Sequence, residues 1–201
     1  MIYSYQHSLQ LIEVDGFLKP SQDPAWLVEH FEKHVKLADG DIVLDMGCGN
    51  GIITLLLAQR YPHCHFHGVD INPQLTQQAK QNANLNNLEN CTFETVDLLA
   101  GNLNERYSHV ISNPPYHLLE KGFTSPNPHK LQAHGCTIAQ LQKWFETGLK
   151  LRDKAGTFTT LQHSQNIPHL EGLFKGHTVQ QNAISNGAGK VSHKTILHIQ
   201  G

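Results

Sequence analysis

The sequence is short of cysteine, of long apolar runs and of net charge. Its four cysteines, Cys48, Cys64, Cys91 and Cys136, are widely spaced and form no Cys-x-x-Cys pair, so free thiols are expected rather than a disulfide framework. The apolar run 52–58 is too short to span a membrane, so no membrane partner is expected. The amino terminus lacks the basic start and apolar core of a signal peptide, which favours a cytoplasmic location.

Charge is small overall but unevenly distributed. The net charge is −2, which does not by itself indicate a nucleic-acid-binding protein. Residues 1–142 hold 8 Lys and Arg against 14 Asp and Glu, whereas residues 143–201 hold 7 against 3. The basic carboxyl-terminal third could face a phosphate backbone, although solvated surface lysines would give the same pattern.

Apolar segments and turn residues alternate along most of the chain. Strands are expected at 40–45, 65–70, 91–96, 107–112 and 156–161, helices at 51–61, 72–86, 138–151 and more weakly 168–174, and closing strands at 177–183 and 194–199. This alternation predicts an α/β fold: a Rossmann-like, doubly wound, mostly parallel seven-stranded sheet with helices on both faces and an antiparallel closing strand. No internal repeat or second core is visible, so one domain over 1–201 is expected.

Two segments outside this alternation also carry signals. Asp23 and Pro24 are typical of a helix start, with Asp23 as N-cap and Pro24 at the first helical position, and the apolar spacing continues to Val35. The polar segment 120–135 is long for a connection in a compact domain, and such loops are usually functional or disordered.

Glycines follow the first predicted strand directly. In a doubly wound sheet, ligands bind at the carboxyl ends of the strands. The segment Asp45-Met-Gly-Cys-Gly-Asn-Gly51 places Gly47, Gly49 and Gly51 there, where the backbone can turn tightly and approach a ligand. The segment lacks the Gly-x-Gly-x-x-Gly spacing of dinucleotide sites, so taken alone it also fits a plain strand-to-helix turn.

Aspartates follow the next two predicted strands. Asp70 is placed to accept hydrogen bonds from ribose hydroxyls. Asp97 could accept one from an adenine amino group, with Val96 and Leu98 enclosing the ring. Each aspartate alone fits an ordinary loop carboxylate, and only the set indicates a nucleoside site.

The segment Asn113-Pro114-Pro115-Tyr116 follows the fourth predicted strand. Two prolines remove two backbone donors and stiffen the chain, while Tyr116 offers an aromatic face beside the Asn113 amide. This arrangement is suited to holding a planar group that carries an NH2. The side-chain carbonyl of Asn113 and the backbone carbonyl of Pro114 would accept its two N–H bonds, and Tyr116 would stack on it.

These motifs, in this order, resemble the class I S-adenosylmethionine-dependent methyltransferases. The resemblance implies S-adenosyl-L-methionine as cofactor, a cofactor-binding half at 40–116 after an amino-terminal segment and helix at 1–39, and a substrate-facing half at 117–201. It implies a catalytic segment of Asn113, Pro114, Pro115 and Tyr116. It implies cofactor contacts from Asp45, Gly47, Cys48, Gly49, Gly51, Asp70, Ile71, Asp97, Leu98 and Asn113.

The flanking segments 15–23, 114–117, 124–128 and 133–134 resemble the bacterial tRNA(Val) adenine-N6-methyltransferase family. The resemblance implies tRNA as partner and adenine N6 as the methylated atom, with substrate contacts from Tyr116, His117, Lys130 and His134. The chain departs from that family at His129-Lys130, where relatives carry Arg, and at Gly135, where Glu often follows the histidine. Protein-glutamine N5-methylation of release factors, DNA adenine methylation and a non-enzymatic scaffold are the alternatives.

No metal is expected. His63, His65 and His67 alternate along one predicted strand and would project to one face, but no carboxylate or cysteine has matching spacing. The chemistry needs none, because a sulfonium methyl group is already activated and catalysis is mainly positioning. A monomer is the default expectation.

Overall fold

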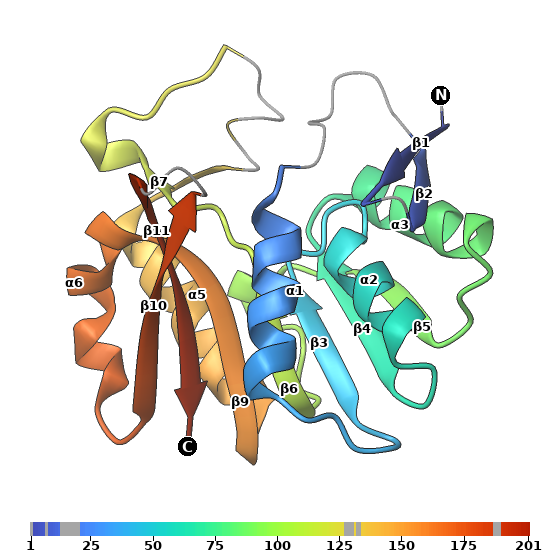
Figure 1. Cartoon of the computed structure of the whole chain (residues 1–201). Coiled ribbons are helices and arrows are strands. Elements are labelled where there is room, and N and C mark those ends of the chain that lie inside the picture. Colours follow the sequence, from blue (N-terminus) through green and yellow to red (C-terminus); the bar gives the residue numbers. More distant parts are fainter. Residues whose placement is uncertain (1, 7, 13–20, 127–130, 132–133, 187–189) are drawn as a thin grey trace.

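The centre of the structure, a computed structural model, is a seven-stranded sheet with the order β10-β11-β9-β6-β3-β4-β5 (Figure 1). The structure describes residues 2–6, 8–12, 21–126, 131, 134–186 and 190–201. Neighbouring strands from β5 to β9 pair in parallel, and β11 lies antiparallel between β9 and β10. The expected α/β class, with a mostly parallel sheet and an antiparallel closing strand, is confirmed.

Within the described residues, the seven expected strands and the expected helices occur in the expected order, and β1–β2 and β7–β8 form two small sheets that were not expected. The strands are β1 Ile2–Tyr5, β2 Leu9–Ile12, β3 Ile42–Met46, β4 His65–Asp70, β5 Cys91–Thr95, β6 Tyr107–Ser112, β7 His117–Leu118, β8 Gly135–Cys136, β9 Arg152–His163, β10 Thr178–Asn186 and β11 Lys190–Gln200. The helices are α1 Asp23–His34, α2 Ile52–Arg60, α3 Pro73–Leu85, α5 Ile138–Leu151 and α6 Ile167–Leu170. Short 3-10 turns lie at Leu98–Ala100, Leu119–Lys121, Ser164–Asn166 and Glu171–Phe174.

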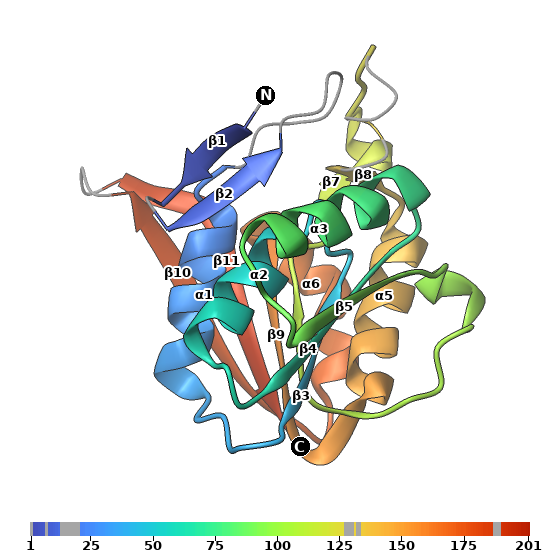
Figure 2. The same ribbon diagram turned by 90° about the vertical axis from the view of Figure 1, so that its right-hand side faces the viewer.

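Helices cover both faces of the sheet, with α1, α2 and α3 on one side and α5 and α6 on the other (Figure 2). Successive strand residues point to opposite faces, so Val43 joins the core under α1 and α2, and Leu44 joins the core under α5. The second core centres on Phe145 of α5 and Phe158 of β9, whose ring centroids are 5.2 Å apart. Burying each such side chain stabilises the fold by about 1.5–3 kcal/mol.

The structure contains an amino-terminal hairpin, β1–β2, that the sequence analysis did not predict. Leu9 and Leu11 are fully buried. The backbone N–H of Ile12 donates to Asn82 Oδ1, and Gln78 Nε2 donates to the Ile12 carbonyl, both from α3. These contacts dock the hairpin on α3 (Figure 1). Strands this short depend on such distant partners and leave little signal in the sequence.

Helix α1 begins one residue earlier than expected. Gln22 is the N-cap and Asp23 is the first helical residue, so the prediction of Asp23 as N-cap is wrong. The Asp23 carboxylate accepts hydrogen bonds from Tyr116 Oη and Lys194 Nζ instead. These tertiary partners occupy the side chain that would otherwise cap the helix.

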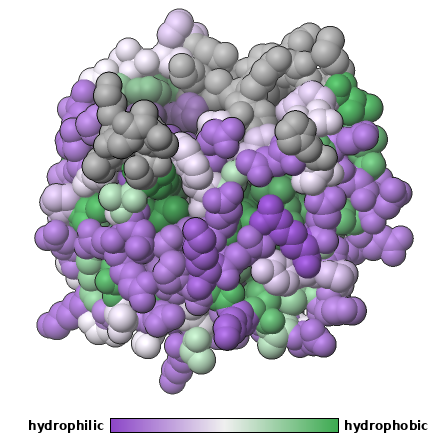
Figure 3. All heavy atoms as spheres, in the orientation of Figure 1, coloured by the Kyte–Doolittle hydropathy of each residue, from purple (hydrophilic) through white to green (hydrophobic). Residues whose placement is uncertain are grey.

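Hydrophilic residues predominate on the face shown in Figure 3, with hydrophobic residues visible between them. Within the described ranges, no helix is long and apolar enough to cross a membrane.

Candidate active site

Four strand ends meet along the carboxyl edge of the sheet. Met46 of β3 is the Cα partner of Val69 in β4 and of Ser112 in β6, so the residues that follow these positions leave the sheet side by side. Asp70 pairs with Thr95 of β5 in the same way. The register therefore gathers the glycine segment, Asp70, Asp97 and Asn113 at one edge, as a doubly wound sheet requires.

The glycine segment makes a tight turn from β3 into α2. Gly47, Gly49 and Gly51 all have positive φ angles, of 73°, 56° and 89°, which residues with a side chain rarely adopt. A Cβ placed on Gly49 would meet no atom within 4 Å, so the backbone here borders open space. A Cβ on Gly51 would lie 3.0 Å from Phe93 and Ala79, so this position needs glycine for packing as well.

Cys48 and Trp144 pack around this turn. Cys48 is buried, and burial raises the pKa of its thiol well above the usual value. A Cβ on Gly47 would lie 3.1 Å from the indole of Trp144, whose Nε1 donates to Ser112 Oγ over 3.0 Å. Trp144 thus joins α5 to the ends of β3 and β6.

Asp45 is buried beneath the glycine segment. Its Oδ2 accepts from the backbone N–H and the hydroxyl of Thr54, over 3.2 and 2.7 Å. Its Oδ1 is buried and has no hydrogen-bond partner among the described residues. Burial above all, with a smaller contribution from the nearby Asp70 carboxylate, raises the pKa of Asp45 to about 7, although the bonds from Thr54 oppose the rise. The site thus holds a buried acceptor that a cationic or N–H group would satisfy.

Asp70 ends β4 with both carboxylate oxygens engaged by the backbone. Oδ2 accepts from Gly49 N and Oδ1 from Asn72 N, each over 2.9 Å. A carboxylate oxygen carries two lone pairs, so each can accept a further bond. Burial raises the pKa of Asp70, and the bonds from Asn72 and Gly49 oppose that rise. The next residue, Ile71, is 52% exposed, which leaves an apolar surface beside the carboxylate.

Asp97 caps the 3-10 turn after β5. Its Oδ1 accepts from Leu99 N and Ala100 N over 2.9 and 3.2 Å, so both bonds end on one oxygen. Val96 and Leu98 beside it are buried. The Val96 N–H donates to the Asp70 carbonyl, which holds the ends of β4 and β5 together.

Asn113 follows β6 next to the glycine segment. Its side-chain oxygen is buried and has no hydrogen-bond partner in the described part of the chain. Leaving such an oxygen unsatisfied costs about 1–3 kcal/mol. Pro114 is buried, and the Pro115 carbonyl accepts from Cys136 Sγ over 3.2 Å. The Asn113 side chain therefore places at the carboxyl edge an amide oxygen to which no described residue donates.

Tyr116 is held from three distant parts of the chain. Its hydroxyl donates to Asp23 Oδ2 over 3.0 Å, and Asp23 is paired with Lys194 Nζ at 2.6 Å. Asn166 Nδ2 donates to the Tyr116 carbonyl over 2.8 Å. The residue is only 5% exposed. Stacking of Tyr116 on a base stays a prediction, and it requires the ring to become more exposed than it is here.

The structure brings together three of the four predicted substrate contacts, Tyr116, His117 and His134. His117 begins β7, and its ring centroid lies 5.0 Å from that of Tyr116 and 5.9 Å from that of His134. These three rings are therefore brought together beside Asn113. Lys130 lies outside the described residues.

The sequence reading did not assign Asp23, Lys194, Asn166 or Cys136 to the site. Asp23, Asn166 and Cys136 bond to Pro115 or Tyr116 from remote positions, and Lys194 Nζ lies over the Tyr116 ring, 5.6 Å from its centroid. Asp23 lies inside the segment 15–23 that carried the resemblance, which was the one available signal.

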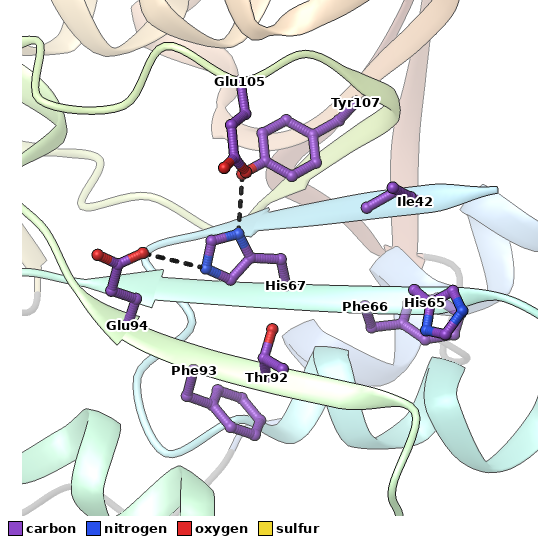
Figure 4. A pocket seen from close by; sticks show the side chains of 9 residues that line it. All are labelled: Ile42, His65, Phe66, His67, Thr92, Phe93, Glu94, Glu105 and Tyr107. Atoms are coloured by element: carbon purple, nitrogen blue, oxygen red, sulfur yellow. Dashed lines mark hydrogen bonds and ion pairs between the residues drawn. The ribbon is translucent and has the colours of Figure 1, made fainter. Parts of the chain in front are cut away.

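A separate hollow of about 430 Å³ is lined by residues of β4 and of the edge strand β5, together with Ile42, Glu105 and Tyr107 (Figure 4). His67 Nδ1 and Tyr107 Oη are 2.8 Å apart, the Tyr107 hydroxyl donates to Glu105 Oε2 at 3.1 Å, and His67 Nε2 lies 3.6 Å from Glu94. None of the predicted site residues lines this hollow. Across the described residues, no group of three or more His, Cys, Asp or Glu is placed to hold a metal ion.

Comparison with known proteins identifies relatives for this arrangement. The model of the family described as "Methyltransferase small domain" matches residues 21–127. The tRNA1(Val) (adenine(37)-N6)-methyltransferase of Vibrio cholerae strain M66-2 is 35% identical over 131 residues, which cover 65% of this chain and 52% of that protein. The release factor glutamine methyltransferase of Fusobacterium nucleatum is 33% identical over 104 residues, 51% of this chain and 29% of that protein. The chain thus spans about half the length of the first relative and less of the second.

Among solved structures, the 16S rRNA N2 methyltransferase RsmC of Thermus thermophilus, in complex with AdoMet and guanosine, has a TM-score of 0.68. It is 18% identical, and the match covers 100% of this chain and 49% of that one. At this identity the likeness concerns the fold.

Proposed function

This chain belongs to the methyltransferase small domain family, and we propose that it transfers the methyl group of S-adenosyl-L-methionine to adenine N6 in tRNA. The observation that carries the proposal is the buried side-chain oxygen of Asn113, which no described residue binds. It lies at the edge where the register also gathers the glycine segment and Asp70. An amino group entering there would supply the missing donor.

The residues of the cofactor half fit S-adenosyl-L-methionine. The open space at Gly49 lets the ligand approach the backbone. The lone pairs left on Asp70 suit ribose hydroxyls, and the exposed Ile71 beside it suits an apolar ring face. Both backbone bonds to Asp97 end on Oδ1, so Oδ2 can accept a hydrogen bond from an adenine amino group. Asp45 Oδ1 would face the cationic part of the cofactor.

Asn113 and Pro114 prepare the amino nitrogen. An exocyclic amine conjugated to a ring is a poor nucleophile because its lone pair is delocalised. When the Asn113 side-chain carbonyl and the Pro114 backbone carbonyl accept its two N–H bonds, the nitrogen can become pyramidal and direct its lone pair at the methyl carbon. The cofactor supplies an activated methyl group, so the protein contributes mainly position and orientation.

The same acceptors would also hold a glutamine amide, so they specify the nitrogen and not the molecule. Adenine in tRNA is supported by the similarity to the tRNA1(Val) enzyme, which extends over a longer part of the chain than the similarity to the release factor enzyme. An unpaired base in an RNA loop can be turned outward into such a site at small cost.

The experiment incubates the purified protein and methyl-labelled cofactor separately with unmodified tRNA, a release factor and duplex DNA. We expect N6-methyladenosine in tRNA. Asn113→Ala should lower the methylation rate by at least about 100-fold, because the amino nitrogen of the substrate is then no longer held in line with the methyl group. Exposed Asn104, which lies before β6, provides the matched control, and Asn104→Ala should keep the wild-type rate.

Label found in the release factor or in DNA, and not in tRNA, would replace the proposed substrate with that molecule. Absence of label from all three, together with measurable cofactor binding, would favour a non-enzymatic role.

A further inference from the structure

Aromatic rings continue outward from Tyr116 along the carboxyl edge. The ring of His117 stacks on Phe123 with centroids 4.7 Å apart and planes inclined by 16°. It also lies 6.4 Å from His163, at the end of β9. His163 in turn stacks on His193 of β11, at 5.9 Å and 17°. Three separate parts of the chain thus contribute four neighbouring rings, which we call the ring row: His117, Phe123, His163 and His193.

The ring row is more accessible than Tyr116. His193 is exposed and the other three residues are partly buried, whereas Tyr116 is 5% exposed. A row of partly exposed rings beside a buried one offers faces on which flat ligands can stack. Strand β9 lies between β6 and β11 in the sheet, and β7 follows β6 along the chain.

Two lysines, Lys121 and Lys194, lie near the ring row. Burial lowers the pKa of His163, and the nearby His117, His193, Lys121 and Lys194 lower it further. A lowered pKa keeps this ring neutral at neutral pH, so His163 offers an aromatic face there and not a fixed positive charge. Lys121 is exposed and supplies a cation beside the rings. Aromatic faces next to cations are the combination that binds single-stranded nucleic acid.

We infer that the ring row is a stacking platform for unpaired RNA nucleotides that flank the methylated base. The inference rests on the proposed function and adds how the loop around the target is held. A protein segment would present few flat groups to so many rings, whereas every nucleotide of an RNA loop carries one. The row thus favours a nucleic acid with unpaired bases over a release factor.

The test measures binding of a fluorescently labelled RNA hairpin with an unpaired loop, and of a fully paired RNA duplex, by anisotropy. His193→Ala should weaken hairpin binding about fivefold or more, and duplex binding much less, because one stacking ring is lost. His193→Phe keeps a ring and should restore hairpin binding. Phe123→Ala should act like His193→Ala. His65→Ala, an exposed histidine at the amino end of β4, is the matched control and should change neither affinity.

Hairpin binding that is equal in wild type, His193→Ala and Phe123→Ala overturns the inference. So does a loss that His193→Phe fails to restore, because a ring face is then not what binds. A His193→Ala protein that binds the hairpin normally but labels a release factor more slowly also overturns it. The proposed function fails separately, when wild-type protein binds the hairpin through these rings yet transfers no methyl group to RNA.

Discussion

The glycine-segment side of the carboxyl edge is held by residues near one another in sequence, whereas the Asn113 side is held by residues far apart. Asp45 bonds Thr54 nine residues away, and Asp70 bonds Asn72 and Gly49 at separations of 2 and 21. Tyr116 bonds Asp23 across 93 residues, and Lys194 reaches Asp23 across 171. Local bonds shape the turn at the proposed cofactor site, which we call the proposed cofactor cradle. On the Asn113 side, the position of Tyr116 instead depends on residues from distant parts of the chain.

The largest expected effect tests the cofactor side. Asp70→Ala removes the acceptor of two backbone N–H groups and of the proposed ribose hydroxyls. Bonds to a charged group contribute about 1.5–3 kcal/mol each, so the cofactor Kd should rise by about 100-fold. Isothermal titration calorimetry with S-adenosyl-L-methionine measures this. Asp70→Asn keeps one acceptor oxygen and should show a smaller loss, and an unchanged Kd in Asp70→Ala would contradict the proposed cofactor cradle.

The same contrast explains what the sequence predicted. Membership of the class I methyltransferases and the fold were confirmed, because strand-end motifs such as that at Asp45 and the strand–helix alternation are local signals. The hairpin β1–β2 and the site contacts of Asp23 were missed. Their bonds depend on α3 and on Lys194, distant residues that no local pattern specifies. The roles of the site residues stay predictions.

A second, smaller effect tests the acceptor side. Asp23→Asn deprives Lys194 of its carboxylate and loosens the anchor of Tyr116, while the proposed cofactor cradle stays untouched. The methylation rate should fall about tenfold, which corresponds to ~1.4 kcal/mol of barrier. The cofactor Kd should not change. The free energy of unfolding should fall by about 1–3 kcal/mol, because a mostly buried acceptor loses its charge.

The control for this variant is made at the more exposed ion pair of Arg60 and Glu32, in which Nη1 and Oε2 lie 2.6 Å apart and the side chains are 36% and 22% exposed. Glu32→Gln should cost less than about 1 kcal/mol in unfolding free energy and leave the methylation rate unchanged. A rise in the cofactor Kd of Asp23→Asn would show that the two sides are coupled and would contradict the contrast drawn above.

The smallest effect concerns pH and the cofactor side alone. Burial raises the pKa of Asp45 from its ordinary value of 3.8 to about 7. Between these two values the folded protein therefore keeps a proton on this carboxyl, whereas the unfolded chain has released it. Between pH 3.8 and about 7, raising the pH favours unfolding, and this carboxyl lowers the free energy of unfolding by up to about 1.4 kcal/mol per pH unit. Asp45→Asn lacks that proton, so its stability relative to wild type should rise with pH.

Urea unfolding of both proteins at several pH values between about 4 and 7 measures this difference. Asp153→Asn, at an exposed aspartate, is the control, and its curve should run parallel to that of wild type. Parallel curves for Asp45→Asn would mean that the buried carboxyl is ionised throughout. Saturating S-adenosyl-L-methionine places a cation beside Asp45 in our proposal, and a cation lowers a carboxyl pKa. The wild-type slope should therefore flatten with cofactor, and that of Asp45→Asn should not.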